Sequence, residues 1–169
     1  MTWRCEQEWG GGFTFEKKIQ QMIVFETSYD KITATLGGKK NIGTTLRSVF
    51  DAADLVKRGL KKNSIYPVLD FFGIEQEQLA AWLNVDEASF SAFADDEFLD
   101  PNVSERVLKL AELMYRGKEV FGRDDYFKDW MNAKIPALSG RKPVELLDTF
   151  SGMEYVLTVL GRIEHGVYS

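Results

Sequence analysis

The segment that decides the fold is QLAAWLNVDEASFSAF, residues 78–93. Apolar residues recur at helical spacing in 76–83 and again in 86–93, with a tight link between the two. Asn84 tolerates the left-handed backbone that such a turn demands, and Asp86 is a typical N-cap for the second helix. Two short helices joined in this way predict a helix-turn-helix.

Helical patterning continues on both sides of this segment. We expect further helices at residues 13–36, 52–60, 64–72, 102–121, 126–131 and 150–165, with 39–51 as a connection or short extended chain. The residues Met22–Phe25 also permit a strand, and Asn102 and Glu105 have the spacing of a capping box. Thr149 is expected to cap the last helix and Gly166 to close it. The predicted fold class is all-α.

The domain organisation follows from this pattern. A polar stretch ending in Gly10-Gly11-Gly12 predicts a flexible leader, and we assign residues 1–28 to a leader of unknown role. Residues 29–100 are expected to form the helix-turn-helix domain, and residues 101–169 a small helical C-terminal domain. The length of 169 residues suffices for one core shared by two such units.

The charge is distributed unevenly along the chain. The net charge of −5 argues against bulk electrostatic binding to nucleic acid, but a basic block lies between Lys39 and Lys62. By contrast, the stretch from Asp86 to Asp100 contains six acidic residues and no basic one, which disfavours base reading by the second helix. DNA contacts would therefore come from the basic block and from two serines of that helix. In the alternative interpretation, the basic block is a solvated helix face. The DNA-binding candidates are Lys57, Arg58, Lys61, Lys62, Ser89 and Ser91.

Single copies of cysteine and histidine limit the chemistry. With only Cys5 and His165, the chain can form no internal disulfide or multi-cysteine metal site, and a histidine-based catalytic triad is improbable. We expect no metal, no cofactor and no enzymatic activity. The start MTWRCEQEW is unlike a signal peptide, and no apolar run approaches a membrane span, so a cytoplasmic protein is expected.

The C-terminal forty residues, 130–169, end in a conspicuous polar tail after an apolar helix. Arg162, Glu164, His165 and Tyr168 suit contacts with a partner's pocket, because Arg pairs with carboxylates and Tyr combines an apolar body with a hydroxyl. In the alternative interpretation, Ile163 and its neighbour Val167 dock the end on its own domain and the polar residues are solvated.

From about Tyr29 onward the chain resembles the Xre/MbcA/ParS-type antitoxins that pair with RES-domain toxins. The resemblance is carried by LVKRGLKKNSIYPVLDFFGI (55–74), by the helix-turn-helix, by SERVLKLAELMYRGKEVFG (104–122) and above all by the terminal run. The matching positions of that run are Trp130, Pro136, Leu138, Gly140, Pro143, Leu147, Asp148, Thr149, Gly152, Leu160, Gly161, Arg162, Ile163, Glu164, Gly166 and Val167-Tyr168-Ser169.

The resemblance implies a non-catalytic antitoxin of a type II toxin–antitoxin pair. Its cognate RES-domain toxin would consume NAD, and the C-terminal domain would cover the NAD pocket. The N-terminal domain would form a homodimer and bind operator DNA; a stand-alone transcriptional regulator is the alternative. The toxin-binding residues would be Trp130, Leu138, Arg141, Leu160, Gly161, Arg162, Ile163, Glu164, His165, Gly166, Val167 and Tyr168.

Overall fold

The computed structural model describes residues 28–166, and over that range every regular element is a helix. This confirms the all-α prediction. Residues 28–35 are helical and are followed by α2 (Lys39–Ile42), α3 (Val49–Arg58), η1 (Lys62–Ile65), α4 (Tyr66–Phe72), α5 (Gln76–Leu83), α6 (Glu87–Ala92), α7 (Pro101–Phe121), α8 (Asp124–Asn132), η2 (Pro136–Leu138), η3 (Pro143–Leu146) and α9 (Phe150–Glu164).

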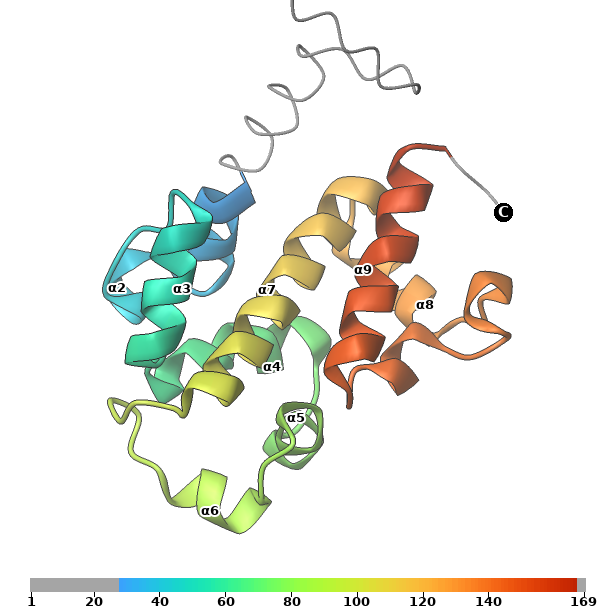
Figure 1. Ribbon diagram of the computed structural model, residues 1–169. Helices are drawn as coiled ribbons and strands as arrows, with labels where there is room; N and C mark the ends of the chain where they lie inside the picture. The colour runs from blue at the N-terminus through green and yellow to red at the C-terminus, as the bar shows by residue number, and fades with distance from the viewer. Residues whose placement is uncertain (1–27, 167–169) are drawn as a thin grey trace, which may run out of the picture.

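The long helix α7 runs through the centre of the molecule (Figure 1). It contacts α3, α4 and α5 of the N-terminal half and also α8 and α9 of the C-terminal half. Its buried apolar side chains recur at helical spacing, so successive turns supply both contacts. One continuous core therefore joins the two halves; α7 contributes Val103, Val107, Leu110, Ala111, Leu113 and Met114 to it.

The helix-turn-helix forms as the sequence predicts. Helix α5 ends at Asn84, whose φ of 56° and ψ of 48° are left-handed, and Asp86 caps α6 by accepting the backbone N–H of Ser89 at 2.9 Å. The N–H and hydroxyl of Ser89 hold the pKa of the Asp86 carboxyl below its usual value. Buried Leu79 and Phe90 attach the two helices to the core.

The start of α7 differs from the sequence prediction. The capping box predicted for Asn102 and Glu105 is wrong, because Asp100 is the N-cap and its side chain accepts the N–H of Asn102 at 2.8 Å. Pro101 occupies the first helical position, where its missing N–H costs nothing. The helix therefore begins at Pro101 and ends, as predicted, before Gly122.

The segment 39–51 is more helical than predicted. It contains α2 and the first turn of α3, which begins at Val49 because Ser48 and Asp51 form a capping box: the hydroxyl accepts the Asp51 N–H at 3.3 Å and the carboxylate accepts the Ser48 N–H at 3.1 Å. The predictions for residues 1–27, including the leader and the possible strand at 22–25, lie outside the described residues.

Gly117 sits where α7 and α8 approach closely. A Cβ built on it would lie 2.4 Å from the ring of Phe127, which is fully buried in the core. Elsewhere in a helix interior, replacing Gly by Ala stabilises by about 1 kcal/mol. At this position the added methyl group must displace a packed aromatic ring, and overpacking outweighs the helical preference.

We therefore expect Gly117→Ala to lower the free energy of unfolding by about 1–3 kcal/mol, measured by urea denaturation. Adding Phe127→Leu should relieve the clash, so the double variant should lose less stability than the sum of the two single variants. A Gly117→Ala protein with a raised melting temperature would contradict this account of the α7–α8 contact.

Candidate functional site at the end of helix α9

Helix α9 is anchored at its start and along its length. Thr149 accepts the N–H of Gly152 at 3.1 Å, which confirms the predicted cap. The helix buries the apolar side chains Met153, Val156, Leu157, Val159 and Leu160. The last turn of α9 follows directly after these residues, so the candidate site at the end of α9 is supported by a firmly packed helix.

Three of the predicted toxin-binding residues belong to the interior or its edge. Leu160 is fully buried and Leu138 is 3% exposed, whereas Trp130 is half-buried with its ring stacked 6.1 Å from that of Phe127. The two leucines are unavailable for direct contact in this conformation, because the chain itself covers them. Their burial disfavours the predicted direct contact, which stays a prediction for them.

The remaining predicted residues lie at the surface as far as the structure describes them. Arg141, Arg162, His165 and Gly166 are exposed, and Ile163 is half-buried. The exposed set comes from two places, the loop after η2 and the last turn of α9. Val167 and Tyr168 lie outside the described residues.

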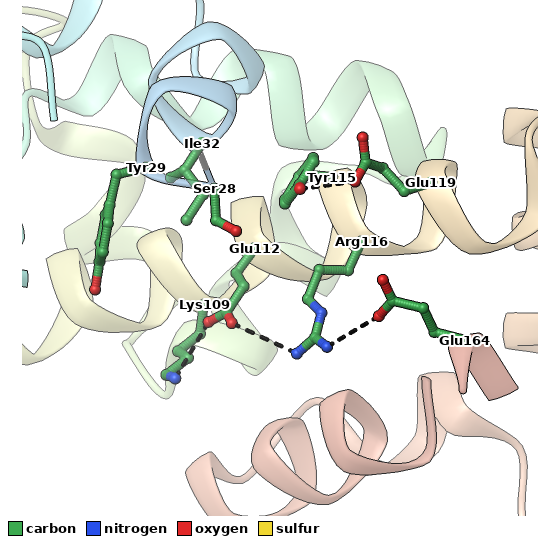
Figure 2. A pocket seen from close by; sticks show the side chains of 9 residues that line it. All are labelled: Ser28, Tyr29, Ile32, Lys109, Glu112, Tyr115, Arg116, Glu119 and Glu164. Atoms are coloured by element: carbon green, nitrogen blue, oxygen red, sulfur yellow. Dashed lines mark hydrogen bonds and ion pairs between the residues drawn. The ribbon is translucent and has the colours of Figure 1, made fainter. Parts of the chain in front are cut away.

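Glu164 has a partner within the chain. Its carboxylate lies 3.3 Å from the guanidinium of Arg116 on α7, which also lies 4.0 Å from Glu112. Figure 2 shows Arg116 reaching from α7 between the two carboxylates. The end of α9 is therefore docked on its own domain through Glu164, beside the half-buried Ile163 that the sequence suggested for this role.

These groups line a polar cleft of about 230 Å³ between helix 28–35, α7 and the end of α9. Deeper along α7, Lys109 pairs with Glu154 of α9 at 2.5 Å and with Glu112 at 3.3 Å. Burial by itself would lower the pKa of Lys109, but the two carboxylates outweigh it and the pKa is raised. The cleft is thus lined by ion pairs that tie α9 to α7.

A further ion pair involves Glu119, which lines the cleft from α7. The amino group of Lys31 binds Glu119, which also accepts the hydroxyl of Tyr115 at 2.7 Å. The bond from Lys31, more than any other influence, holds the pKa of Glu119 below its usual value. Helix 28–35 is joined to α7 in this way.

Sequence reasoning missed this network. The spacing of Lys109, Glu112 and Arg116 predicts neighbouring charges on one helical face, a signal that was present in the sequence. Their pairing with Glu154 and Glu164 depends on how α9 packs, which no local pattern specifies. Within the described part of the chain, no three His, Cys, Asp or Glu side chains are grouped closely enough to hold a metal ion.

The basic block is not one helix face. Helix α3 ends at Arg58, and Lys62 is buried, with its amino group donating to the carbonyls of Ser91 at 3.1 Å and Phe93 at 2.8 Å. In this conformation Lys62 is covered by the chain and its charge stabilises the C-terminal end of α6, which disfavours the predicted contact with DNA. Lys61 is half-buried beside Phe98.

The other DNA-binding candidates lie on two elements. Lys57 and Arg58 are exposed at the end of α3, where Arg58 donates to the carbonyl of Ile42 at 2.9 Å. Ser89 and Ser91 are exposed on α6. The structure therefore leaves a basic end of α3 and a separate, acidic surface around α6.

Replacing Lys62 by Met should lower the free energy of unfolding by about 1–3 kcal/mol, because two carbonyls at the end of α6 lose a charged donor. Lys57→Met, which removes a charge from an exposed position, should change it by no more than about 0.5 kcal/mol. Denaturant titration of both variants measures the difference. Equal effects would show that Lys62 is not a structural clamp.

The fold and the docked α9 together define the class: a helix-turn-helix protein with a small helical C-terminal unit. No helix among residues 28–166 combines the length and apolar character that a membrane span requires. A family profile described as "Antitoxin Xre-like helix-turn-helix domain" matches residues 51–112, and one described as "Antitoxin Xre/MbcA/ParS C-terminal toxin-binding domain" matches residues 116–166. The chain belongs to the Xre/MbcA/ParS-type antitoxins.

Individual relatives agree with this assignment. A protein named "Prs ADP-ribosylating antitoxin" from Sphingobium sp. is 26% identical over 72% of this chain and 83% of its own length. Proteins named "Antitoxin Xre" from Yersinia enterocolitica and Photorhabdus laumondii are 37% and 36% identical, over 41% and 39% of this chain. The match spans less than half the length of these last two, 47% and 45% respectively.

Proposed function

We propose that this antitoxin neutralises a RES-type, NAD-consuming toxin by covering the toxin's active site with its C-terminal domain. Membership of a toxin–antitoxin system and a toxin-binding domain at residues 116–166 are established by the family matches. The single observation that carries the finer proposal is the exposed end of α9, where Arg162 in the last turn and the C-cap His165 are exposed on a helix packed on α7.

Preorganisation supports this use of α9. A segment that is already ordered loses less conformational entropy on binding than a loose one, so a helix held by buried Leu157 and Leu160 presents its end at low cost. Arg162 can form a bidentate pair with a carboxylate of the toxin. Arg141, exposed on the neighbouring loop, supplies a second cation for the same surface.

The chemistry of the toxin is inferred from the family resemblance and from one relative's name. ADP-ribosylation takes its ADP-ribose from NAD, so a relative named "Prs ADP-ribosylating antitoxin" supports pairing with an NAD-using toxin. The antitoxin itself would be non-catalytic and cytoplasmic and would hold no cofactor. Its function would be that of an inhibitor.

Deleting residues 161–169 should restore toxicity when the antitoxin is co-expressed with the toxin encoded by the adjacent gene. Leu160 and the preceding core residues of α9 remain, so the truncated chain should keep its fold, as circular dichroism can verify. Arg162→Glu provides a point-variant control that reverses one exposed charge. Full neutralisation by the folded truncated protein would disprove the proposed covering of the active site.

We further propose that residues 29–100 form the dimerising helix-turn-helix domain and that residues 101–169 form the toxin-binding domain. Helix α7 would begin the second domain while completing the core of the first. The homodimer would place two toxin-binding ends in one complex.

Operator binding is a second candidate activity, favoured by the exposed cations Lys57 and Arg58 at the end of α3. In the alternative, the protein would act as a stand-alone transcriptional regulator. Exposed acidic residues flank α6, with Asp86 before it and Asp95, Asp96 and Glu97 after it. Phosphate contacts from α3, together with Lys61 and the hydroxyls of Ser89 and Ser91, would therefore have to provide the affinity.

Binding to the promoter DNA of its own operon should weaken steeply with salt. Lys57→Gln/Arg58→Gln should reduce the slope of log K against log [salt] by about 2, since about one counterion is released per phosphate contact. Fluorescence anisotropy over a salt series measures this slope. An unchanged slope would exclude these two residues, and no complex at low salt would exclude operator binding.

A further inference from the structure

We propose that Arg116 is a positioning residue that fixes the direction in which the chain leaves α9, acting through Glu164 and Gly161. This inference rests on the proposed covering of the toxin by the end of that helix. It reassigns Glu164, which the sequence suggested as a toxin contact, to a role inside the antitoxin.

The geometry places Arg116 at the last turn of α9. Its Nη2 lies 3.3 Å from Oε2 of Glu164, and its Nη1 lies 4.0 Å from Oε1 of Glu112 on its own helix. Figure 2 shows the guanidinium held between these carboxylates. Because Glu112 lies on the α7 side of the guanidinium, the pair with Glu164 links the last turn of α9 to α7.

A second attachment lies earlier on α9. Lys109, two turns before Arg116 on α7, binds Glu154 at 2.5 Å. The two ion pairs are separated along both helices, one near the start of α9 and one at its end. Burial of its apolar side chains already packs the body of α9 on α7. The ion pair at Glu164 adds a polar attachment for the last turn, beyond the last buried residue, Leu160.

Gly161 supplies an independent observation. It lies inside α9, where Ala is favoured over Gly, and a Cβ built on it would lie 3.3 Å from Nη2 of Arg116. The absence of a side chain at Gly161 therefore lets the guanidinium lie close to the backbone of α9 without a tight contact. Arg116 thus lies close to two positions of the last turn of α9, Gly161 and Glu164.

The pair is half-exposed, with side-chain exposures of 31% for Arg116 and 41% for Glu164, so it adds little to folding. The pair has a larger effect on the affinity for a partner, because the proposed covering of the toxin requires the chain to leave α9 in one direction. Without the pair, binding has to restore that direction, and affinity falls without loss of the fold.

The test is a double-mutant cycle on the full-length antitoxin, with the purified toxin of the adjacent gene as the probe. Arg116→Gln and Glu164→Gln should each weaken toxin binding about two- to fivefold, and the double variant should be no weaker than either single variant. The charge exchange Arg116→Glu/Glu164→Arg should return affinity to within about twofold of the parent. Lys118→Gln, which removes an ion pair to Asp124 away from α9, is the matched control and should leave affinity unchanged.

The outcomes separate the two proposals. If the 161–169 deletion still neutralises the toxin, the proposed function fails, whatever the cycle shows. If the deletion abolishes neutralisation but the effects of the two Gln variants are additive and the exchange does not restore affinity, Glu164 contacts the toxin directly and the positioning role is overturned. If Arg116→Gln lowers the melting temperature, the test rests on the toxin affinity of Glu164→Gln at low and at high salt. Loss of a positioning ion pair should reduce affinity less at high salt, because salt screens that pair in the parent protein.

Discussion

Both halves of the described chain depend on the burial of a single helix, α7. Its apolar residues pack against α3, α4 and α5 in one direction and against α8 and α9 in the other, so neither half has a complete core without it. A buried hydrogen bond also fixes the start of α7. The hydroxyl of Ser104 accepts the N–H of Leu60 at 2.9 Å and so joins α7 to the chain that follows α3. Loss of packing on either side would expose apolar surface of α7 to water.

This arrangement has a mechanical consequence. The two family profiles meet between residues 112 and 116, inside α7 and not at a linker. A flexible linker would let the helix-turn-helix and the toxin-binding end move independently, whereas a shared helix holds them in one geometry. The ion pairs from Lys109, Arg116 and Glu119 lie on this same helix, so they act between elements already fixed by burial.

Sequence patterns predicted those features whose cause is local. The bounds of α5, the left-handed Asn84 and the caps Asp86 and Thr149 follow from chemistry within a few residues, and the structure confirms them. Local patterns did not indicate which of the predicted site residues are buried where distant segments meet. Lys62 resembles other surface lysines in sequence, yet the carbonyls at the end of α6 bury it, and Leu138 and Leu160 were assigned to a contact surface although the core encloses them. Burial depends on tertiary packing, which a one-dimensional charge count cannot include.

The separation of charge constrains how this antitoxin can use its helix-turn-helix. A duplex that received α6 in its major groove would bring its phosphates towards Asp95, Asp96 and Glu97, and these charges repel it. Burial of Lys62 removes one of the predicted DNA-binding cations, and the other three of that set are Lys57 and Arg58 at the end of α3 and Lys61. If DNA approached that end of α3, the cations there would contact its phosphates while α6 stayed outside the major groove. Such contacts give affinity but read little of the base sequence. The acidic surface around α6 is compatible with a helix-turn-helix that serves mainly as a scaffold for the toxin-binding end. Any preference for a DNA sequence would then have to come from the shape of the DNA.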